Sequence, residues 1–152
     1  MTWRWPLAMA VCWWPFMAVH ELGHVLGTWI CGGTVETVVL WPWTISQTIR
    51  SGSCAPLVDT WAGAVLGSLI PIAIWLLLKR TRFIWPVQFF AGFCAIANGL
   101  YLACGWPLAA GDAGELVTLG TPPWALITFG IPTALGGLLI WHLLPPATTQ
   151  AD

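Results

Sequence analysis

The chain has 152 residues, of which 58% are hydrophobic and 7% are charged, and its formal net charge is −1. Ordinary globular domains carry about 25% charged residues, so this composition excludes a soluble domain, a disordered chain, collagen and a coiled coil. The near-zero net charge also gives no indication of nucleic-acid binding. Thirteen tryptophans are present, and Trp favours the membrane interface. We therefore expect an integral membrane protein that contacts the lipid bilayer.

Four apolar runs are long enough to cross a membrane, which takes about 20 residues as a helix. They are Trp5–Cys31, Pro56–Leu78, Phe83–Cys104 and Pro123–Leu144. Unbroken apolar runs of this length favour helices over strands of alternating character. The fold class that we predict is an all-α integral membrane protein with about four transmembrane helices, in a single membrane-embedded domain over residues 1–152.

The segments between these runs differ in character. Gly32–Ala55 is long and polar, and its β-branched Thr34–Leu40 predicts a short membrane-associated strand or hairpin after the first helix. Lys79–Arg82 forms a tight charged turn. Gly105–Pro122 is rich in glycine, and it allows a short helix from Asp112 to Leu119.

Two G-x-x-x-G patterns occur in the apolar runs. Gly23 and Gly27 form one in the first run, and Gly63 and Gly67 form the other in the second. Such patterns let two helix backbones approach closely in a membrane, although glycine is also common in membrane helices without that role.

The basic residues predict the orientation in the membrane. Arg4, Lys79, Arg80 and Arg82 fall on one side of a four-span chain, and Arg50 falls on the other. The positive-inside rule then places both termini in the cytoplasm and the two longer loops outside.

The first apolar run contains His20-Glu21-Leu22-Gly23-His24, which fits the pattern H-E-x-x-H. Two histidines four residues apart lie on one helix face, so both imidazoles can reach one metal ion. Zinc accepts such ligands, and a glutamate beside the first histidine can act as general base toward a zinc-bound water. Ionisable groups inside a membrane helix are costly, which favours a functional role over packing. We predict one Zn²⁺ per chain on His20 and His24, with Glu21 as the catalytic base.

A third ligand is expected among the acidic residues. The third apolar run is parallel to the first, so Asp112, which follows it, reaches the same side of the membrane as the histidines. Asp59 reaches that side as well, and Glu36 and Glu115 remain further candidates. His142 lies at the far end of the fourth run, where we expect it to lie at the membrane interface.

At these residues the chain resembles the site-2 protease family of intramembrane zinc metalloproteases, in a small form without a PDZ domain. The resemblance rests on the His20–His24 motif, the strand-like segment after Gly32-Gly33, the small-residue run Trp61–Gly67, and Asn98 with Gly111-Asp112. It implies His20, His24 and Asp112 as zinc ligands and Glu21 as base. It also implies that Asn98 orients the substrate or the site.

The predicted function is therefore that of a zinc metalloendopeptidase that hydrolyses peptide bonds of membrane-embedded protein substrates. One alternative is a non-catalytic, protease-like scaffold subunit bound to partners in a larger membrane complex. Another is a porphyrin-binding subunit that uses His20 or His24 with His142 as axial ligands, but this would leave Glu21 without a role.

Overall fold

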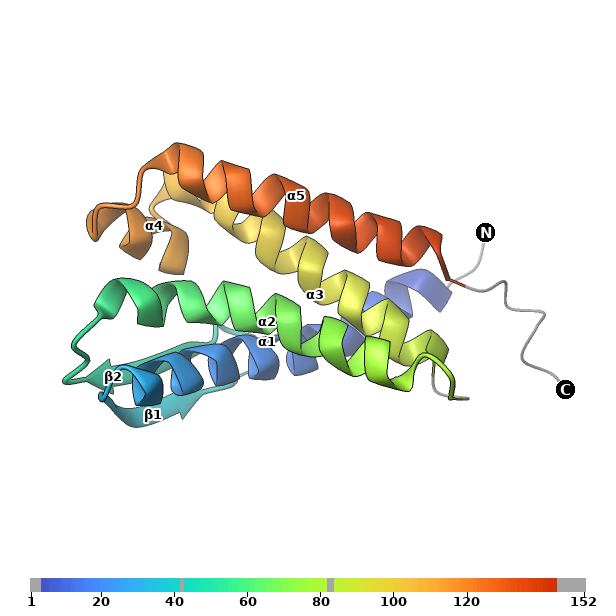
Figure 1. Cartoon of the computed structure of the whole chain (residues 1–152), viewed down its shortest axis with the longest axis horizontal. Helices are drawn as coiled ribbons and strands as arrows, with labels where there is room; N and C mark the ends of the chain where they lie inside the picture. Colours follow the sequence, from blue (N-terminus) through green and yellow to red (C-terminus); the bar gives the residue numbers. More distant parts are fainter. Residues whose placement is uncertain (1–3, 42, 82–83, 145–152) are drawn as a thin grey trace, which may run out of the picture.

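The computed structural model describes residues 4–41, 43–81 and 84–144. Four long helices, one short helix, one 3₁₀ turn and one β-hairpin make up this part of the chain (Figure 1). In chain order they are α1 (Arg4–Ile30), β1 (Thr34–Val39), β2 (Gln47–Ser51), α2 (Pro56–Leu78), α3 (Ile84–Gly105), η1 (Trp106–Leu108), α4 (Gly111–Thr118) and α5 (Pro123–His142).

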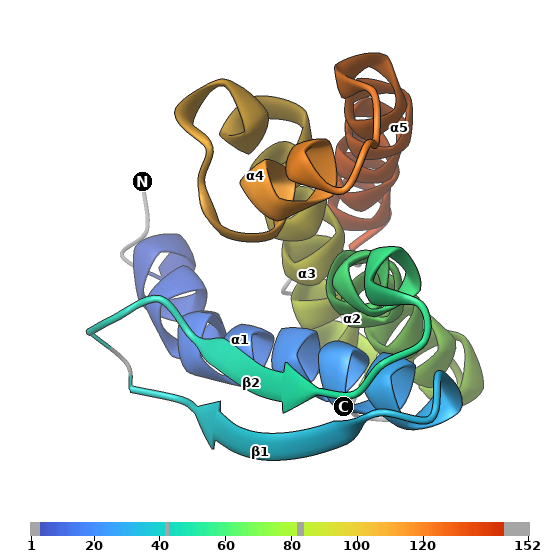
Figure 2. The same cartoon turned by 90° about the vertical axis from the view of Figure 1, so that its left-hand side faces the viewer.

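The long helices alternate in direction along one axis of the molecule (Figure 1). Helix α1 packs on α2, α2 packs on α3, and α3 packs on α5. The β-hairpin and α4 lie at the end of the molecule where α1 ends and α2 begins (Figure 1). Seen from this end, the hairpin lies alongside α1, and α4 lies beside α3 (Figure 2).

The helices agree closely with the apolar runs of the sequence. The second run coincides with α2, and the ends of α1, α3 and α5 differ by at most two residues from the predicted ones; Arg82 and Phe83 lie outside the described residues. Three helical segments are long and apolar enough to cross a membrane, namely Pro56–Leu78, Ile84–Leu108 and Pro123–His142. Helix α1 has 27 residues but is not among them, and the polar side chains of His20, Glu21 and His24 lower its hydropathy. The structure is thus consistent with a membrane protein, and a count of four spans stays a prediction.

The predicted strand is one half of an antiparallel hairpin. Strand β1 pairs with β2 from Thr34 opposite Ser51 to Val39 opposite Gln47, with an irregularity between Val35 and Thr37. Backbone hydrogen bonds join both ends of the hairpin to the end of α1, because Gly33 N–H donates to Thr28 O at 2.8 Å and Cys54 N–H donates to Cys31 O at 3.3 Å. The hairpin is therefore fixed in place beside the last turns of α1.

Glycines set the distance between the helix backbones, as the G-x-x-x-G patterns predict. A Cβ atom on Gly23 would lie 2.5 Å from Ala62 O of α2. The same relation holds between α3 and α5, where a Cβ on Gly99 would lie 2.5 Å from Gly130 O and 2.7 Å from Ala134 N. These helices therefore meet backbone to backbone.

A small apolar cluster holds the short helix α4 in place. Its members come from α2, α3, α4 and α5 and are fully buried; they are Ala64, Leu102, Ala113, Leu116 and Leu126. Since Ala113 and Leu116 belong to α4, this cluster fixes the side of α4 that faces away from solvent. The opposite side of that helix remains free to carry polar groups.

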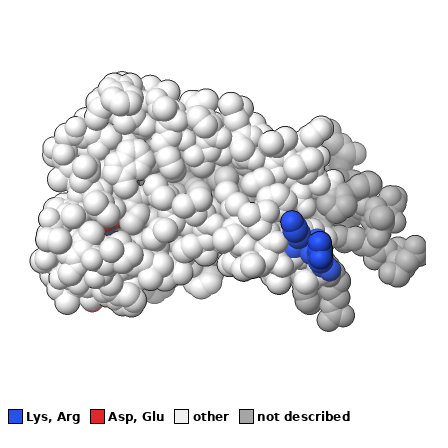
Figure 3. All heavy atoms as spheres, viewed as in Figure 1, with Lys and Arg blue, Asp and Glu red and all other residues white. Residues whose placement is uncertain are grey.

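Two of the described basic residues, Lys79 and Arg80, are exposed in the turn between α2 and α3. Figure 3 shows the blue atoms of this turn at the end of the molecule opposite the hairpin. The positive-inside rule would place this basic turn in the cytoplasm, and the cytoplasmic location of the termini remains a prediction.

Replacing Gly99 by Ala tests the close approach of α3 and α5. The added methyl group meets backbone atoms of α5, so overpacking of about 1–3 kcal/mol is expected to outweigh the helix-propensity gain of about 1 kcal/mol. Gly136→Ala in α5 is the matched control, because a Cβ there has no atom within 4 Å. In detergent, Gly99→Ala should melt at a lower temperature than the wild type, and Gly136→Ala should melt at the same temperature or higher. The opposite order would contradict the packing described here.

Candidate metal centre

Two histidines of α1 face the interior one helical turn apart. His20 is 7% exposed and His24 is 2% exposed. Their Nε2 atoms are 3.2 Å apart, which follows from the four-residue spacing on one helix face. Both imidazoles therefore present the same kind of atom to the same point.

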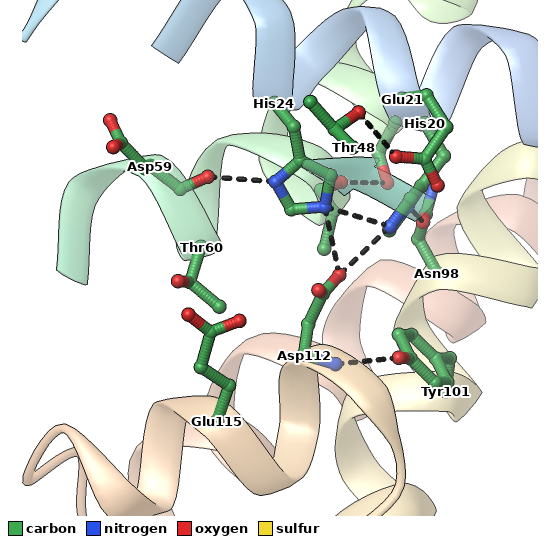
Figure 4. Close-up of polar contacts among 12 residues, drawn as sticks. His20, Glu21, His24, Thr48, Asp59, Thr60, Asn98, Tyr101, Asp112 and Glu115 are labelled. Atoms are coloured by element: carbon green, nitrogen blue, oxygen red, sulfur yellow. Dashed lines mark hydrogen bonds and ion pairs between the residues drawn. The ribbon is translucent and has the colours of Figure 1, made fainter. Parts of the chain in front are cut away.

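Asp112 of α4 completes this cluster (Figure 4). Its Oδ2 lies 2.8 Å from His20 Nε2 and 3.1 Å from His24 Nε2. One ligand atom from each of the three residues lies within 4.8 Å of the others, so His20, His24 and Asp112 could hold a metal ion. The structure thus brings together the two histidines and Asp112, the acidic residue expected on their side of the membrane from the direction of the apolar runs.

The outer nitrogen of each ring faces an oxygen acceptor. His20 Nδ1 lies 2.8 Å from Asn98 Oδ1, and His24 Nδ1 lies 2.8 Å from the backbone carbonyl of Asp59. A carbonyl oxygen can only accept, so we infer that each Nδ1 carries the proton. The Nε2 lone pairs are then free for a metal, which is the arrangement that oriented histidine ligands use.

The charge of the cluster also suits a cation. Burial alone would raise the pKa of the Asp112 carboxyl, but positive charge on the adjacent His20 and His24 rings, which can donate from Nε2 only when doubly protonated, lowers this pKa well below its ordinary value. Asp112 is thus an anion that faces the Nε2 atoms of both histidines. Each of these oxygen–nitrogen contacts is favourable only if the imidazole carries a second proton, on Nε2, or if a cation lies between the two atoms. A divalent cation bound to two nitrogens and one carboxylate satisfies all three groups, and zinc accepts this donor set.

Glu21 is held by the hairpin. Its side chain is 2% exposed, and Thr48 Oγ1 of β2 donates a hydrogen bond to Glu21 Oε2 at 2.6 Å. A short hydrogen bond to a carboxylate is a strong one, so it fixes the orientation of Glu21 beside the histidine pair.

Arg50, two residues further along β2, reaches the same region. Its Nη1 lies 3.1 Å from His24 Nδ1, and its Nη2 donates to Thr60 Oγ1 at 2.8 Å. Nη2 also contacts both carboxylate oxygens of Glu115 in α4, at 3.0 and 3.2 Å. Tyr101 supports α4 from the other side, because the Asp112 N–H donates to Tyr101 Oη at 2.7 Å.

The other residues considered as ligands have different surroundings. Asp59 offers its backbone carbonyl, whereas its carboxylate points away from the cluster (Figure 4). Glu115 pairs with Arg50. Glu36 is exposed on β1, and His142 is exposed at the end of α5.

Sequence reasoning missed the roles of Thr48, Arg50 and Tyr101. A signal for the first two is present in the sequence, because polar residues at alternate positions of a strand point to one face. The sequence predicts a strand or hairpin but does not delimit the second strand, and the shared face of Thr48 and Arg50 becomes clear only from the pairing of β2 with β1. Tyr101 carries no comparable signal.

No protein-family model matches the chain, and no curated protein or solved structure matches it either. The assignment of a function therefore rests on the residues of this chain.

Gly63 of α2 provides the space that the His24 ring occupies. A Cβ atom at this position would collide with the imidazole atoms of His24. We expect Gly63→Ala to displace that ring and to weaken zinc binding about tenfold or more, the loss typical of disturbed metal ligands. Titration of the purified protein with zinc measures this, with Gly136→Ala as the matched helix control. Zinc affinity equal to that of the wild type would mean that His24 does not need its present position to bind the ion.

Proposed function

We propose that this protein is an intramembrane zinc metalloprotease that hydrolyses peptide bonds of membrane-embedded proteins. The observation that carries the proposal is the convergence of His20, His24 and Asp112 on one point, with the adjacent Glu21 buried and held by Thr48. Zinc hydrolases use such a set of groups. Two imidazoles and one carboxylate bind the metal, and a further carboxylate transfers protons.

The residues of the chain divide the work between them. His20, His24 and Asp112 would hold the ion, and Asn98 and the Asp59 carbonyl would orient the two rings. A zinc ion held there would supply Lewis acidity for a peptide carbonyl and for water. Glu21 takes the proton of the attacking water and returns it to the leaving amine.

The surroundings of the cluster support a membrane-embedded substrate. Three helical segments of the described chain are apolar enough to cross a membrane, and α3, which carries Asn98, lies within one of them. A substrate helix hides its peptide bonds in its own hydrogen bonds, so a segment must unwind before its carbonyl can be attacked. Thr48 and Arg50 of the hairpin lie beside the cluster and add polar groups to this end of the molecule.

The metal content of the detergent-purified protein tests the first half of the proposal. We expect about one zinc per chain in the wild type and loss of that zinc in His24→Ala, because three protein ligands are the usual minimum for a catalytic zinc site. His142→Ala is the control, since His142 is exposed at the far end of α5 and should not affect the zinc content.

A well-folded wild type that takes up no zinc after metal repletion would refute the protease proposal. A scaffold subunit in a larger membrane complex would then be the better interpretation. A Soret band in the visible spectrum would instead indicate a bound porphyrin.

Glu21→Gln tests the second half of the proposal. The amide keeps the size of the side chain but cannot take a proton, so cleavage of a membrane-protein substrate should fall by about 100-fold or more, as for loss of a general base. The zinc content should stay at the wild-type value. Glu36→Gln, on the exposed side of β1, should cleave normally. Normal cleavage by Glu21→Gln would mean that another group is the base.

A further inference from the structure

Arg50 occupies an unusual place for an arginine. Its side chain is only 14% exposed, and its guanidinium contacts three other elements, at His24 of α1, Thr60 of α2 and Glu115 of α4. The other described Lys and Arg side chains, Lys79 and Arg80, are exposed at the opposite end of the molecule. Among the described Lys and Arg side chains, Arg50 is thus the one that contacts α1, α2 and α4 around the candidate metal centre.

The contact with His24 is not what holds Arg50 in this place. The His24 Nδ1 that donates to the Asp59 carbonyl has no lone pair left for Arg50, because a neutral imidazole offers one donor and one acceptor nitrogen. With Nε2 on a metal, the guanidinium faces an N–H group. Thr60 and the Glu115 carboxylate are therefore the groups that bind Arg50, the latter by two contacts of 3.0 and 3.2 Å.

Glu115 is also linked to a metal ligand through α4. Asp112 and Glu115 are three residues apart on this eight-residue helix, so they lie on the same face. Tyr101 holds the backbone at Asp112, and Arg50 holds the following turn at Glu115. The polar side of α4 is thus attached at one point to α3 and at another to β2.

We propose that the Arg50–Glu115 ion pair is a positioning pair for the metal centre. It holds the Asp112 carboxylate against the two histidines, and it neutralises the positive charge that would otherwise repel a cation beside His24. The proposal deepens the proposed function and rests on its metal site, but it does not depend on which reaction the metal supports.

The zinc affinity of the full-length protein in detergent, measured by competition with a chromophoric chelator, tests this proposal. Glu115→Gln should weaken zinc binding about tenfold, the lower end of the range for groups that orient metal ligands. Glu36→Gln removes an equal charge from an exposed position on β1 and should bind zinc within twofold of the wild type. The melting temperature of the zinc-free protein should be nearly the same for both variants, because position 115 is half-exposed and the amide oxygen of the glutamine still accepts a hydrogen bond from Arg50.

A charge exchange provides the second test. Glu115→Arg places two like charges together and should weaken zinc binding more than Glu115→Gln. The double variant Arg50→Glu with Glu115→Arg restores the pair and should recover most of that loss. Failure of the double variant to bind zinc more tightly than Glu115→Arg would overturn the proposal.

Two further results would also overturn it. One is an unchanged zinc affinity in Glu115→Gln. The other is an affinity loss that is matched by a lower melting temperature of the zinc-free protein, since the pair would then serve the fold in general. A wild type that binds no zinc is a different result, because it refutes the proposed function as well as the pair.

Discussion

The contact between the His20–His24 pair and Asp112 is the constraint on which the arrangement of the molecule depends. An anionic carboxylate buried beside two imidazoles is tolerated only when these groups compensate one another. The contact joins α1 to α4; otherwise α1 packs mainly on α2, and the apolar side of α4 packs with α2, α3 and α5. The hydrophobic cluster at Ala113 and Leu116 fixes the orientation of α4, and the polar contact attaches the other side of this helix to α1.

Small residues make this contact possible. The His24 ring lies where a side chain on Gly63 would be, and the backbone of α1 meets that of α2 at Gly23. Each loss of a Cβ atom gives up some helix propensity, by about 1 kcal/mol for a glycine in place of alanine. The small residues let the two rings come within hydrogen-bond distance of Asn98 and the Asp59 carbonyl, which compensates the burial of the rings.

The sequence predicted the helices well, because apolar length is a local property that needs no knowledge of the fold. His20 and His24 followed from their spacing, and Asp112 followed from counting the direction of successive spans. Asn98, which lies against His20, was indicated only by the resemblance to a family, and the remaining partners could not be predicted because they depend on tertiary contacts. Thr48 and Arg50 act through the face that β2 turns toward α1, which depends on the pairing with β1 and on where the hairpin ends are bonded. The use of the Asp59 carbonyl rather than its carboxylate likewise depends on how α2 meets α1.

The residues of the candidate metal centre are far apart in the chain, since the contact of His20 with Asp112 spans 92 residues. During synthesis the two histidines leave the ribosome long before the carboxylate does, and a contact of such sequence separation forms only after the intervening helices have been inserted and packed. It follows that a chain interrupted before residue 112 holds two histidines and no third ligand. The proposed metal centre can therefore be complete only after α4 has been synthesised and packed.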